Sequence, residues 1–497
     1  MRGIGLKVTI ISVILVLTLF HSISNQDNNN SLGSHTFVVT ANDTKTPIKH
    51  VINIFFENHS FDNFFGIYPE DFHGTNSSLM ANLSVPVNLL GNQSDLSKLT
   101  AVPNGSFGTT DPIEGWAPYH LDWNHGAMNG FQNGSGKQSL SYFTASQMSP
   151  LWDLAEEYGL ADNYFAPVIS ESTPNHLYYL AGYSPVINDY GPPPYIPFSE
   201  SVMGELSHFG ISWAWYVQPP TFNFPDWRFF SGIDHYSGNL RSWYSFEGSL
   251  ANDTLPSVSW VFTQGINIYS GAPPNNVDCG ELWLLHVINL IEESPEWNST
   301  AIFITWDEFG GYYDQVSPPV LDGEQLGFRI PLIVVSPFSK EDYISSTLMT
   351  HTSIIAFIDY NWKIPALNQF VSVSNIPLDF FCFPSNGNDK MFLRGPYNIA
   401  AVAGFVIPST ITYHMNETML DFDYASHFPV TPQIPFGNLT YSRYGSSNLT
   451  LSMINSSLYI HRDVTYTPFT LSSYFLVFLI MINGVAASAA IWRKKHV

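Results

Sequence analysis

The chain has 497 residues, of which 45% are hydrophobic, and its 41 Asp and Glu against 18 Lys and Arg give a formal net charge of −23. This composition excludes an intrinsically disordered protein, because so many apolar side chains can bury enough surface to offset the entropy of ordering. It also argues against nucleic acid as a partner, since a strongly acidic chain without a basic patch repels phosphate backbones.

Both ends of the chain have the pattern of membrane-targeting segments. Residues 1–24 begin with Arg2 and Lys7, continue with an apolar run and end in small and polar residues, as a secretory signal peptide does; an uncleaved anchor is the alternative. Residues 471–492 are almost entirely apolar, long enough to cross a bilayer, and the basic tail 493–497 follows directly. Because basic residues stay in the cytoplasm, we expect a single-pass membrane protein at the cell surface with its main domain outside.

Two further features fit an extracellular location. Asn-x-Ser/Thr triplets recur along the chain, for example at Asn42 and Asn298, and predict a glycoprotein. Cys279 and Cys382 are the only cysteines, so a disulfide scaffold and a cysteine-rich metal site are excluded. Whether these two cysteines pair stays open.

Strand-like and helix-like segments alternate in the centre of the chain. Short apolar runs, typical of strands buried on both faces of a sheet, occupy residues 51–56, 211–216, 258–262, 301–306 and 330–335. Segments with helical character lie between them, at residues 151–158, 280–292 and 350–361. The alternation predicts an α/β domain over residues 48–395, with a mostly parallel sheet covered by helices on both faces.

The segments that flank this domain differ from it in composition. Residues 25–47 are polar and rich in asparagine, which predicts a flexible leader. Residues 396–467 alternate apolar and polar side chains and contain many turns, so we expect a small β-rich stalk domain before the membrane.

Oxygen-bearing side chains follow two of the expected strands where each strand ends. Glu57 and Asn58 come directly after the first strand, and Asp307 and Glu308 directly after the strand at 301–306. In open α/β sheets ligands bind at the carboxyl ends of strands, so these side chains should meet in one crevice. Carboxylates crowded together are costly unless a cation neutralises them. An all-oxygen set favours calcium, magnesium or manganese over zinc.

This metal-site hypothesis competes with two simpler interpretations. The acids could be solvated loop residues or helix caps. Asn58 also lies in an Asn-x-Ser triplet, so it could instead be a glycosylated surface residue.

A third segment, Glu171-Ser172-Thr173-Pro174-Asn175-His176, carries a candidate nucleophile. Pro174 suits the first turn of a helix, so Ser172 or Thr173 would lie at a helix N-terminus, where backbone N–H groups favour a phosphate-like anion. A hydroxyl beside a divalent cation loses its proton more readily and can attack phosphorus. On the residues alone, an ordinary helix cap is the favoured interpretation.

Taken in order, these motifs resemble the phosphoesterase family of bacterial phospholipases C and related acid phosphatases, within the alkaline-phosphatase-like superfamily. The resemblance rests on residues 57–66, 172–178, 305–314 and 327–331, and it covers roughly residues 48–385. It implies an alkaline-phosphatase-like α/β fold and metal-dependent hydrolysis of a phosphoric monoester or a phospholipid diester. A serine would form a phosphoryl-enzyme that water then hydrolyses.

The resemblance also implies roles for individual residues. One divalent metal ion, of calcium, magnesium, manganese or iron, would be held by Glu57, Asn58, Asp307 and Glu308. Ser172 is preferred to Thr173 as the nucleophile, and Asn175 is its supporting neighbour in binding the substrate.

Three more residues are candidates for work on the substrate. His120 could protonate the leaving oxygen or bind phosphate, and His351 could act in catalysis or support the site from behind. Arg329 could clamp a phosphate with two hydrogen bonds. Each of the three also has a structural interpretation, as a histidine that supports the fold or an arginine that forms a salt bridge.

Some positions depart from the family pattern. Glu114 stands where Asp-Pro-x-His-x-Trp has its histidine, Gln315 stands where another histidine is expected, and a His-Pro pair before residues 280–292 is missing. The metal and nucleophile motifs are intact while the assisting histidines are depleted. This leaves open the general acid and the choice between monoester and diester, and it keeps a non-catalytic surface glycoprotein with an adhesion or envelope role as the alternative.

Overall fold

The computed structural model describes six stretches of the chain and the backbone of four strands near its C-terminal end. The stretches are 43–68, 99–104, 106–189, 194–217, 226–262 and 269–383, and the four strands lie between residues 412 and 462. The predicted signal peptide (1–24), most of the leader, the predicted membrane span (471–492) and the tail (493–497) lie outside the described residues. Among the helices that are described, none has the length and hydrophobicity needed to span a bilayer.

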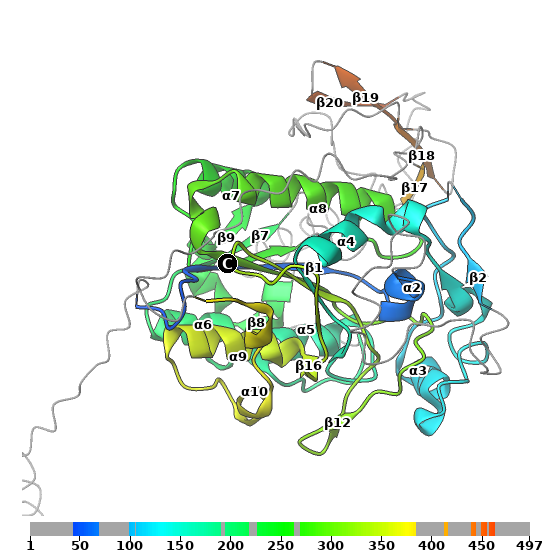
Figure 1. Ribbon diagram of the computed structural model, residues 1–497, viewed down its shortest axis with the longest axis horizontal. Helices are drawn as coiled ribbons and strands as arrows, with labels where there is room; N and C mark the ends of the chain where they lie inside the picture. The colour runs from blue at the N-terminus through cyan, green and yellow to red at the C-terminus, as the bar shows by residue number, and fades with distance from the viewer. Residues whose placement is uncertain are drawn as a thin grey trace, which may run out of the picture.

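An eight-stranded sheet forms the centre of the fold, in the order β15-β4-β14-β11-β1-β10-β7-β9 (Figure 1). The strands are β1 (His50–Phe56), β4 (Gly159–Ala161), β7 (Trp213–Val217), β9 (Leu240–Ser242), β10 (Val258–Phe262), β11 (Thr300–Trp306), β14 (Leu332–Val335) and β15 (Tyr343–Ser345). Only β14 runs antiparallel to its neighbours, β11 and β4. The predicted α/β architecture with a mostly parallel sheet is therefore confirmed, and each expected strand overlaps an observed one.

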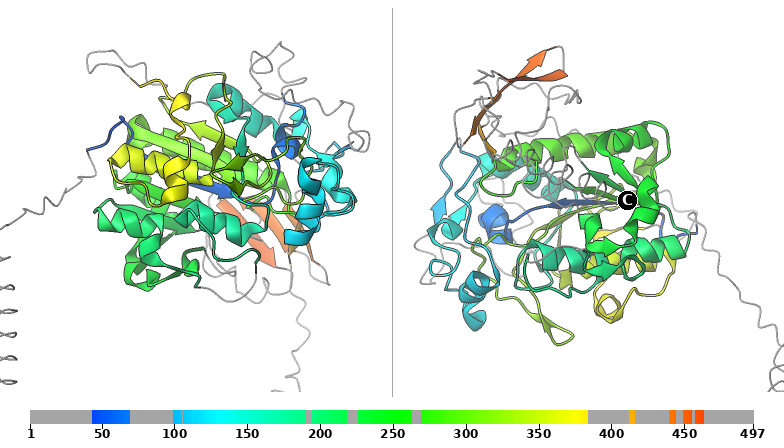
Figure 2. Two further views of the ribbon diagram at one scale, coloured as in Figure 1. Left: turned by 90° about the horizontal axis from the view of Figure 1, so that it is seen from below. Right: turned by 180° about the vertical axis from the view of Figure 1, so that it is seen from behind.

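Helices cover both faces of this sheet (Figures 1 and 2). One face carries α4 (Ala145–Glu157), α7 (Trp243–Ala251) and α8 (Val277–Glu292). The other carries α5 (Ser172–Ala181), α6 (Val202–His208), α9 (His351–Trp362) and α10 (Gln369–Val373). The three predicted helical segments correspond to α4, α8 and α9.

The central strand β1 shows why such a strand is almost entirely apolar. Val51 and Phe55 belong to one hydrophobic core, while Ile52, Ile54 and Phe56 belong to the core on the opposite face. Successive side chains of a strand point to opposite faces, so a strand between two helical layers is apolar at nearly every position. The exception inside β1 is Asn53, which is buried and donates through Nδ2 to the carbonyl of Ser259 at 3.3 Å.

Besides seven 3₁₀ helices between Asn124 and Phe380, shorter elements complete the central part of the described chain. They are the helices α2 (Phe61–Phe65) and α3 (Trp116–Trp123) and the strands β2 (Thr100–Ala101), β3 (Ser141–Tyr142), β5 (Tyr164–Phe165), β6 (Ile196–Pro197), β8 (Phe230–Ser231), β12 (Val320–Leu321), β13 (Glu324–Gln325) and β16 (Met349–Thr350). The last residues of the predicted leader are docked rather than free, since Thr46 Oγ1 donates to Asn361 Oδ1 at 2.6 Å.

A separate four-stranded sheet lies within the range predicted to be β-rich. It consists of β17 (Thr412–Met415), β18 (Leu439–Arg443), β19 (Leu449–Ile454) and β20 (Ser457–Arg462). The boundaries of this region as a stalk domain stay a prediction.

Candidate active site

The site begins where β1 and β11 end side by side. The two strands are parallel neighbours with Phe56 in register with Trp306, so the residues that follow them, Glu57 and Asp307, leave the same edge of the sheet. The backbone N–H of Asn58 donates to Asp307 Oδ1 at 2.7 Å and ties the two strand ends together. Both carboxyl groups are buried, Asp307 completely.

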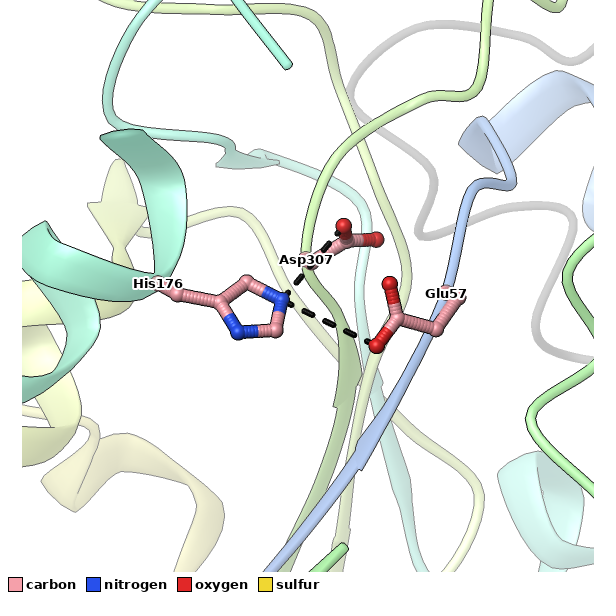
Figure 3. Close-up of side chains that lie close together, drawn as sticks. All are labelled: Glu57, His176 and Asp307. Carbon is pink, nitrogen blue, oxygen red and sulfur yellow. Dashed lines mark ion pairs between the residues drawn. The ribbon is translucent and has the colours of Figure 1, made fainter. Parts of the chain in front are cut away.

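Helix α5 brings His176 to these carboxylates (Figure 3). Its Nε2 lies 3.8 Å from Glu57 Oε1 and 3.5 Å from Asp307 Oδ2. All three residues are buried, and ligand atoms from each lie within 4.8 Å of one another. His176 Nε2 and Asp307 Oδ2 have no hydrogen-bond partner among the described residues. Buried polar atoms of this kind need a partner, so the three residues fit a divalent metal ion.

The electrostatics of this cluster reflect burial and crowding. Burial raises the pKa of Glu57 well above its usual range, and the nearby charge of Asp307 raises it further. Burial would also raise the pKa of Asp307, but the nearby His176 imidazole, 3.5 Å away, and the N–H of Asn58 outweigh it, and the pKa falls below its usual value. The pKa of His176 is well above its usual range, because Asp226, Asp307 and Glu57 outweigh the lowering effect of burial.

Asn58 links the cluster to Ser172. Its Oδ1 accepts from Ser172 Oγ at 3.4 Å, and its Nδ2 donates to Glu114 Oε1 at 2.5 Å. The residue is 8% exposed with its amide nitrogen already hydrogen-bonded, so the surface-glycosylation interpretation of Asn58 is wrong. Asn58 has a φ of 63°, a conformation that asparagine tolerates better than most residues.

The glycine pair after Glu308 is required by this packing. A side chain on Gly310 would place its Cβ 2.2 Å from the carbonyl oxygen of Asn58, and the φ of Gly310 is 62°. Only glycine combines that close approach with a positive φ at no cost.

Glu308 is fully buried and engaged on both oxygens. Oε1 accepts from the hydroxyl of Tyr119 at 3.0 Å and Oε2 accepts from the N–H of Gly310 at 2.8 Å. Burial raises the pKa of Glu308 well above its usual range, followed by the charge of Asp307. The structure thus brings Glu57 and Asp307 together with His176, while Asn58 and Glu308 have protein partners and their metal-binding role stays a prediction.

Ser172 is the first residue of α5, as the position of Pro174 predicts. Besides Asn58, its hydroxyl interacts with Asp307 and helps to lower the pKa of that carboxyl. The next N–H of the helix, from Thr173, donates to Asp189 Oδ1 at 2.7 Å. A carboxylate of the chain itself therefore already occupies part of the helix N-terminus.

Asn175 braces the turn that presents Ser172. Its Oδ1 accepts from the N–H of Val168 at 3.1 Å, and its Nδ2 donates to the carbonyls of Ser170 and Glu171, each at 2.9 Å. Asn175 is fully buried, and these hydrogen bonds stabilise the backbone of the segment that carries Ser172. Its role in binding the substrate stays a prediction.

His351 lies directly behind Asp307. Its Nε2 must donate to the backbone carbonyl of Asp307, at 2.8 Å, and its Nδ1 then accepts from the hydroxyl of Tyr164, also at 2.8 Å. Burial lowers the pKa of His351 to about 3, so the ring is neutral at physiological pH. These contacts hold the metal-site backbone in place, and a direct catalytic role stays a prediction.

His120 is half-buried and stacks on Trp116 of its own helix, α3, with ring centroids 3.8 Å apart. Its Nδ1 lies 2.7 Å from the carbonyl of Trp116. Burial lowers its pKa. The part proposed for it as a general acid stays a prediction.

Arg329 is fully buried in an ion-pair network. Its Nη2 donates to Asp62 Oδ1 at 2.8 Å, Nε to Asp314 Oδ2 at 3.2 Å and Nη1 to the carbonyl of Asp162 at 3.1 Å. Asp62 belongs to the motif at residues 57–66 and Asp314 to the motif at residues 305–314. These contacts account for the burial of Arg329, and its use as a phosphate clamp stays a prediction.

Two functional candidates escaped the sequence analysis. His176 lies in the nucleophile segment, where its spacing from Ser172 was the only available signal. Asp226, whose Oδ2 lies 2.6 Å from His176 Nδ1, follows no motif and approaches through folding alone. Glu114 was noted only as a departure, yet it contacts Asn58.

The phosphoesterase family model matches residues 48–365, well over half of the chain. The chain belongs to the phosphoesterase family. Phospholipase C A of Mycobacterium tuberculosis is 26% identical over 390 residues, covering 65% of this chain and 74% of that protein. Non-specific phospholipase C1 of Arabidopsis thaliana is 25% identical over 336 residues, covering 59% and 62% respectively. The family and these relatives identify a hydrolase of phosphoric esters.

Among solved structures, a member of the alkaline phosphatase superfamily from Vibrio parahaemolyticus is similar to this chain. It is 11% identical with a TM-score of 0.31, and the match covers 58% of this chain and 76% of that one.

Proposed function

We propose that this protein is a metal-dependent phosphodiesterase of the phospholipase C type, with Ser172 as its nucleophile. The observation that carries the proposal is the convergence of Glu57, Asp307 and His176 on one buried point. Asn58 connects that point to the Ser172 hydroxyl at 3.4 Å. A divalent ion held by these residues would act as a Lewis acid on the phosphoryl group and lower the pKa of a nearby hydroxyl.

Individual residues have separate roles in the proposed reaction. The Ser172 hydroxyl gives up its proton toward Asp307, with which it already interacts, and its oxygen forms a bond to phosphorus as the bond to the leaving alcohol breaks. The leaving alcohol departs as its oxygen takes up a proton, and the retained ester group stays on phosphorus, so that Ser172 is held in a phosphodiester. Water then cleaves the bond between Ser172 and phosphorus, which restores the serine hydroxyl and releases a phosphomonoester. Asn58 and Asn175 hold the nucleophile segment in the orientation for attack.

Acidic groups around Ser172 favour a diester over a monoester. Asp189 accepts from the backbone N–H of Thr173 at 2.7 Å, and Glu171, the residue before Ser172, accepts from the N–H of Asp189 at 3.0 Å. A monoester carries about two negative charges near neutral pH and a diester only one, so repulsion by this surround penalises the monoester more. The names of the relatives, phospholipases C, point to the same substrate class.

The location proposed for this activity is the outer face of a membrane. The apolar segment 471–492, followed by basic residues, would tether the domain, and residues 1–24 would direct its export. The tether would hold the enzyme beside phospholipid substrates.

The test is hydrolysis of p-nitrophenyl phosphorylcholine and p-nitrophenyl phosphate by the full-length protein, with and without a chelator, at acidic and neutral pH. We expect chelator-sensitive turnover with a preference for the diester. Turnover of neither substrate at any pH would overturn the proposal and favour the non-catalytic glycoprotein instead. A preference for the monoester would overturn the substrate assignment alone.

A further inference from the structure

His176 is fixed on both ring nitrogens. Nδ1 lies 2.6 Å from Asp226 Oδ2, and Nε2 faces Glu57 Oε1 at 3.8 Å and Asp307 Oδ2 at 3.5 Å. An ionised carboxylate can only accept, so Nδ1 carries the proton that it donates to Asp226. Nε2 is then the atom presented to the two carboxylates at the strand ends.

The ring of His176 is also held sterically. It packs edge-on against Phe55, with centroids 4.9 Å apart at 77°, and against Phe262 at 6.3 Å and 76°. His176 is 4% exposed and Asp226 6%. An imidazole wedged between aromatic rings and a carboxylate keeps Nε2 aimed at the strand ends.

This arrangement is that of a metal-binding histidine with its supporting carboxylate. Histidines that bind metals nearly always donate their other ring N–H to a carboxylate or carbonyl, which fixes the tautomer and raises the basicity of the ligand. Nε2 is buried without a hydrogen-bond partner among the described residues, and so is Asp307 Oδ2 beside it. A positive charge, either on an ion between them or on Nε2 itself, would satisfy both atoms.

We propose that His176 Nε2 is a ligand of the metal ion and that Asp226 is its positioning residue. The donor set is therefore mixed nitrogen and oxygen rather than the all-oxygen set expected from the sequence. Imidazole nitrogen suits zinc, copper, iron and nickel, whereas calcium, magnesium and manganese favour oxygen ligands. The site consequently selects a transition-metal ion. The inference rests on the proposed metal dependence and deepens it.

The competing explanation is that a protonated His176 forms an ion pair with Glu57 and Asp307 and never binds metal. The two explanations differ in one observable, which is whether an imidazole nitrogen is bonded to the ion. Pulsed electron paramagnetic resonance of the full-length protein loaded with Mn²⁺ measures that directly, as a nitrogen hyperfine coupling.

We expect nitrogen coupling in the wild-type protein and its loss in His176→Asn. The asparagine amide can still donate to Asp226 in place of Nδ1 but has no atom at the position of Nε2. His286→Asn is the matched control, because His286 also faces a carboxylate, Glu247, at 3.7 Å but lies outside the site. It should leave the coupling unchanged.

Competition titrations test the selectivity and the role of Asp226. Asp226→Asn should weaken Mn²⁺ binding by about 10- to 100-fold while the nitrogen coupling persists, as loss of a supporting hydrogen bond does. His176→Asn should reduce the preference for Zn²⁺ over Mg²⁺ at least about tenfold, since it leaves oxygen donors only.

The outcomes separate this inference from the proposed function. Bound Mn²⁺ without nitrogen coupling, in a protein that hydrolyses diesters, overturns the role of His176 alone. Nitrogen coupling that persists in the His176→Asn variant also overturns the role of His176 as a ligand. If the wild-type protein binds no ion and a chelator has no effect on turnover, the metal-dependent mechanism itself is wrong. The wild-type spectrum by itself shows whether a nitrogen is bonded to the ion, even if a variant fails to fold.

Discussion

The amide nitrogen of Asn58 donates to Glu114 Oε1 at 2.5 Å, and this bond turns the amide oxygen toward Ser172. Glu114 is the residue that replaces a histidine expected from the family pattern. A departure that appeared to weaken the site in sequence thus contributes to its geometry in the fold.

Glu114→Ala should lower turnover by about tenfold or more, because the Asn58 amide loses the partner that sets its orientation. Glu114→Gln keeps an acceptor oxygen and should retain most of the activity. Steady-state kinetics on a diester substrate, with circular dichroism to check folding, measure the effect. Equal activity of the alanine and glutamine variants would show that the hydrogen bond does not matter.

Ser172→Ala should reduce turnover by at least about a thousandfold, since removal of a nucleophile leaves only binding and electrostatic stabilisation. Thr173→Ala is the matched control. The contact that Thr173 makes with Asp189 comes from its backbone N–H, which the variant keeps, so its activity should stay within a few-fold of wild type. If instead the Thr173 variant is inactive and the Ser172 variant active, the nucleophile has been assigned to the wrong hydroxyl.

Arg329→Leu should destabilise the protein by about 3–5 kcal/mol, because it leaves Asp62 and Asp314 buried without their counter-charge. Denaturant unfolding measures the loss. Arg241→Leu serves as the control, since Arg241 is half-exposed, and it should cost less than about 1 kcal/mol. A stable Arg329 variant with a raised KM would assign Arg329 to the substrate instead.

Stability should fall between about pH 4 and pH 7 because of a buried acid in α8. Burial raises the pKa of Asp278 to about 7, from about 3.9 in an unfolded chain. A raised pKa favours the protonated, folded form, so this contribution is complete below the unfolded pKa and is lost as the pH rises through the folded pKa. The loss is at most about 4 kcal/mol.

Asp278→Asn removes this titration. The variant should match wild type near pH 4 and exceed it in free energy of unfolding at pH 8, measured by denaturant titration at both values. Asp253→Asn, at an exposed position, is the control and should show no such difference. A variant that is no more stable than wild type at pH 8 would contradict the linkage.

The sequence by itself determined the sheet and its helical layers. Near-continuous apolar runs such as 51–56 and 301–306 are typical of strands buried between two hydrophobic layers, so local pattern is enough to identify β1 and β11. The acids that follow these strands were identified in the same way, because parallel neighbours end at one edge. The local preference of Pro174 placed Ser172 or Thr173 at the start of a helix, and α5 begins at Ser172.

Only the tertiary structure decided which side chains meet at that edge. Asp226 reaches His176 across 50 positions of sequence and Asn58 reaches Asp307 across 249, distances over which no local pattern operates. Glu308 follows β11 like its neighbour Asp307, yet its oxygens are bound by Tyr119 and Gly310. Strand order brings backbones together, but the direction of each side chain depends on packing and hydrogen bonding among residues remote in sequence.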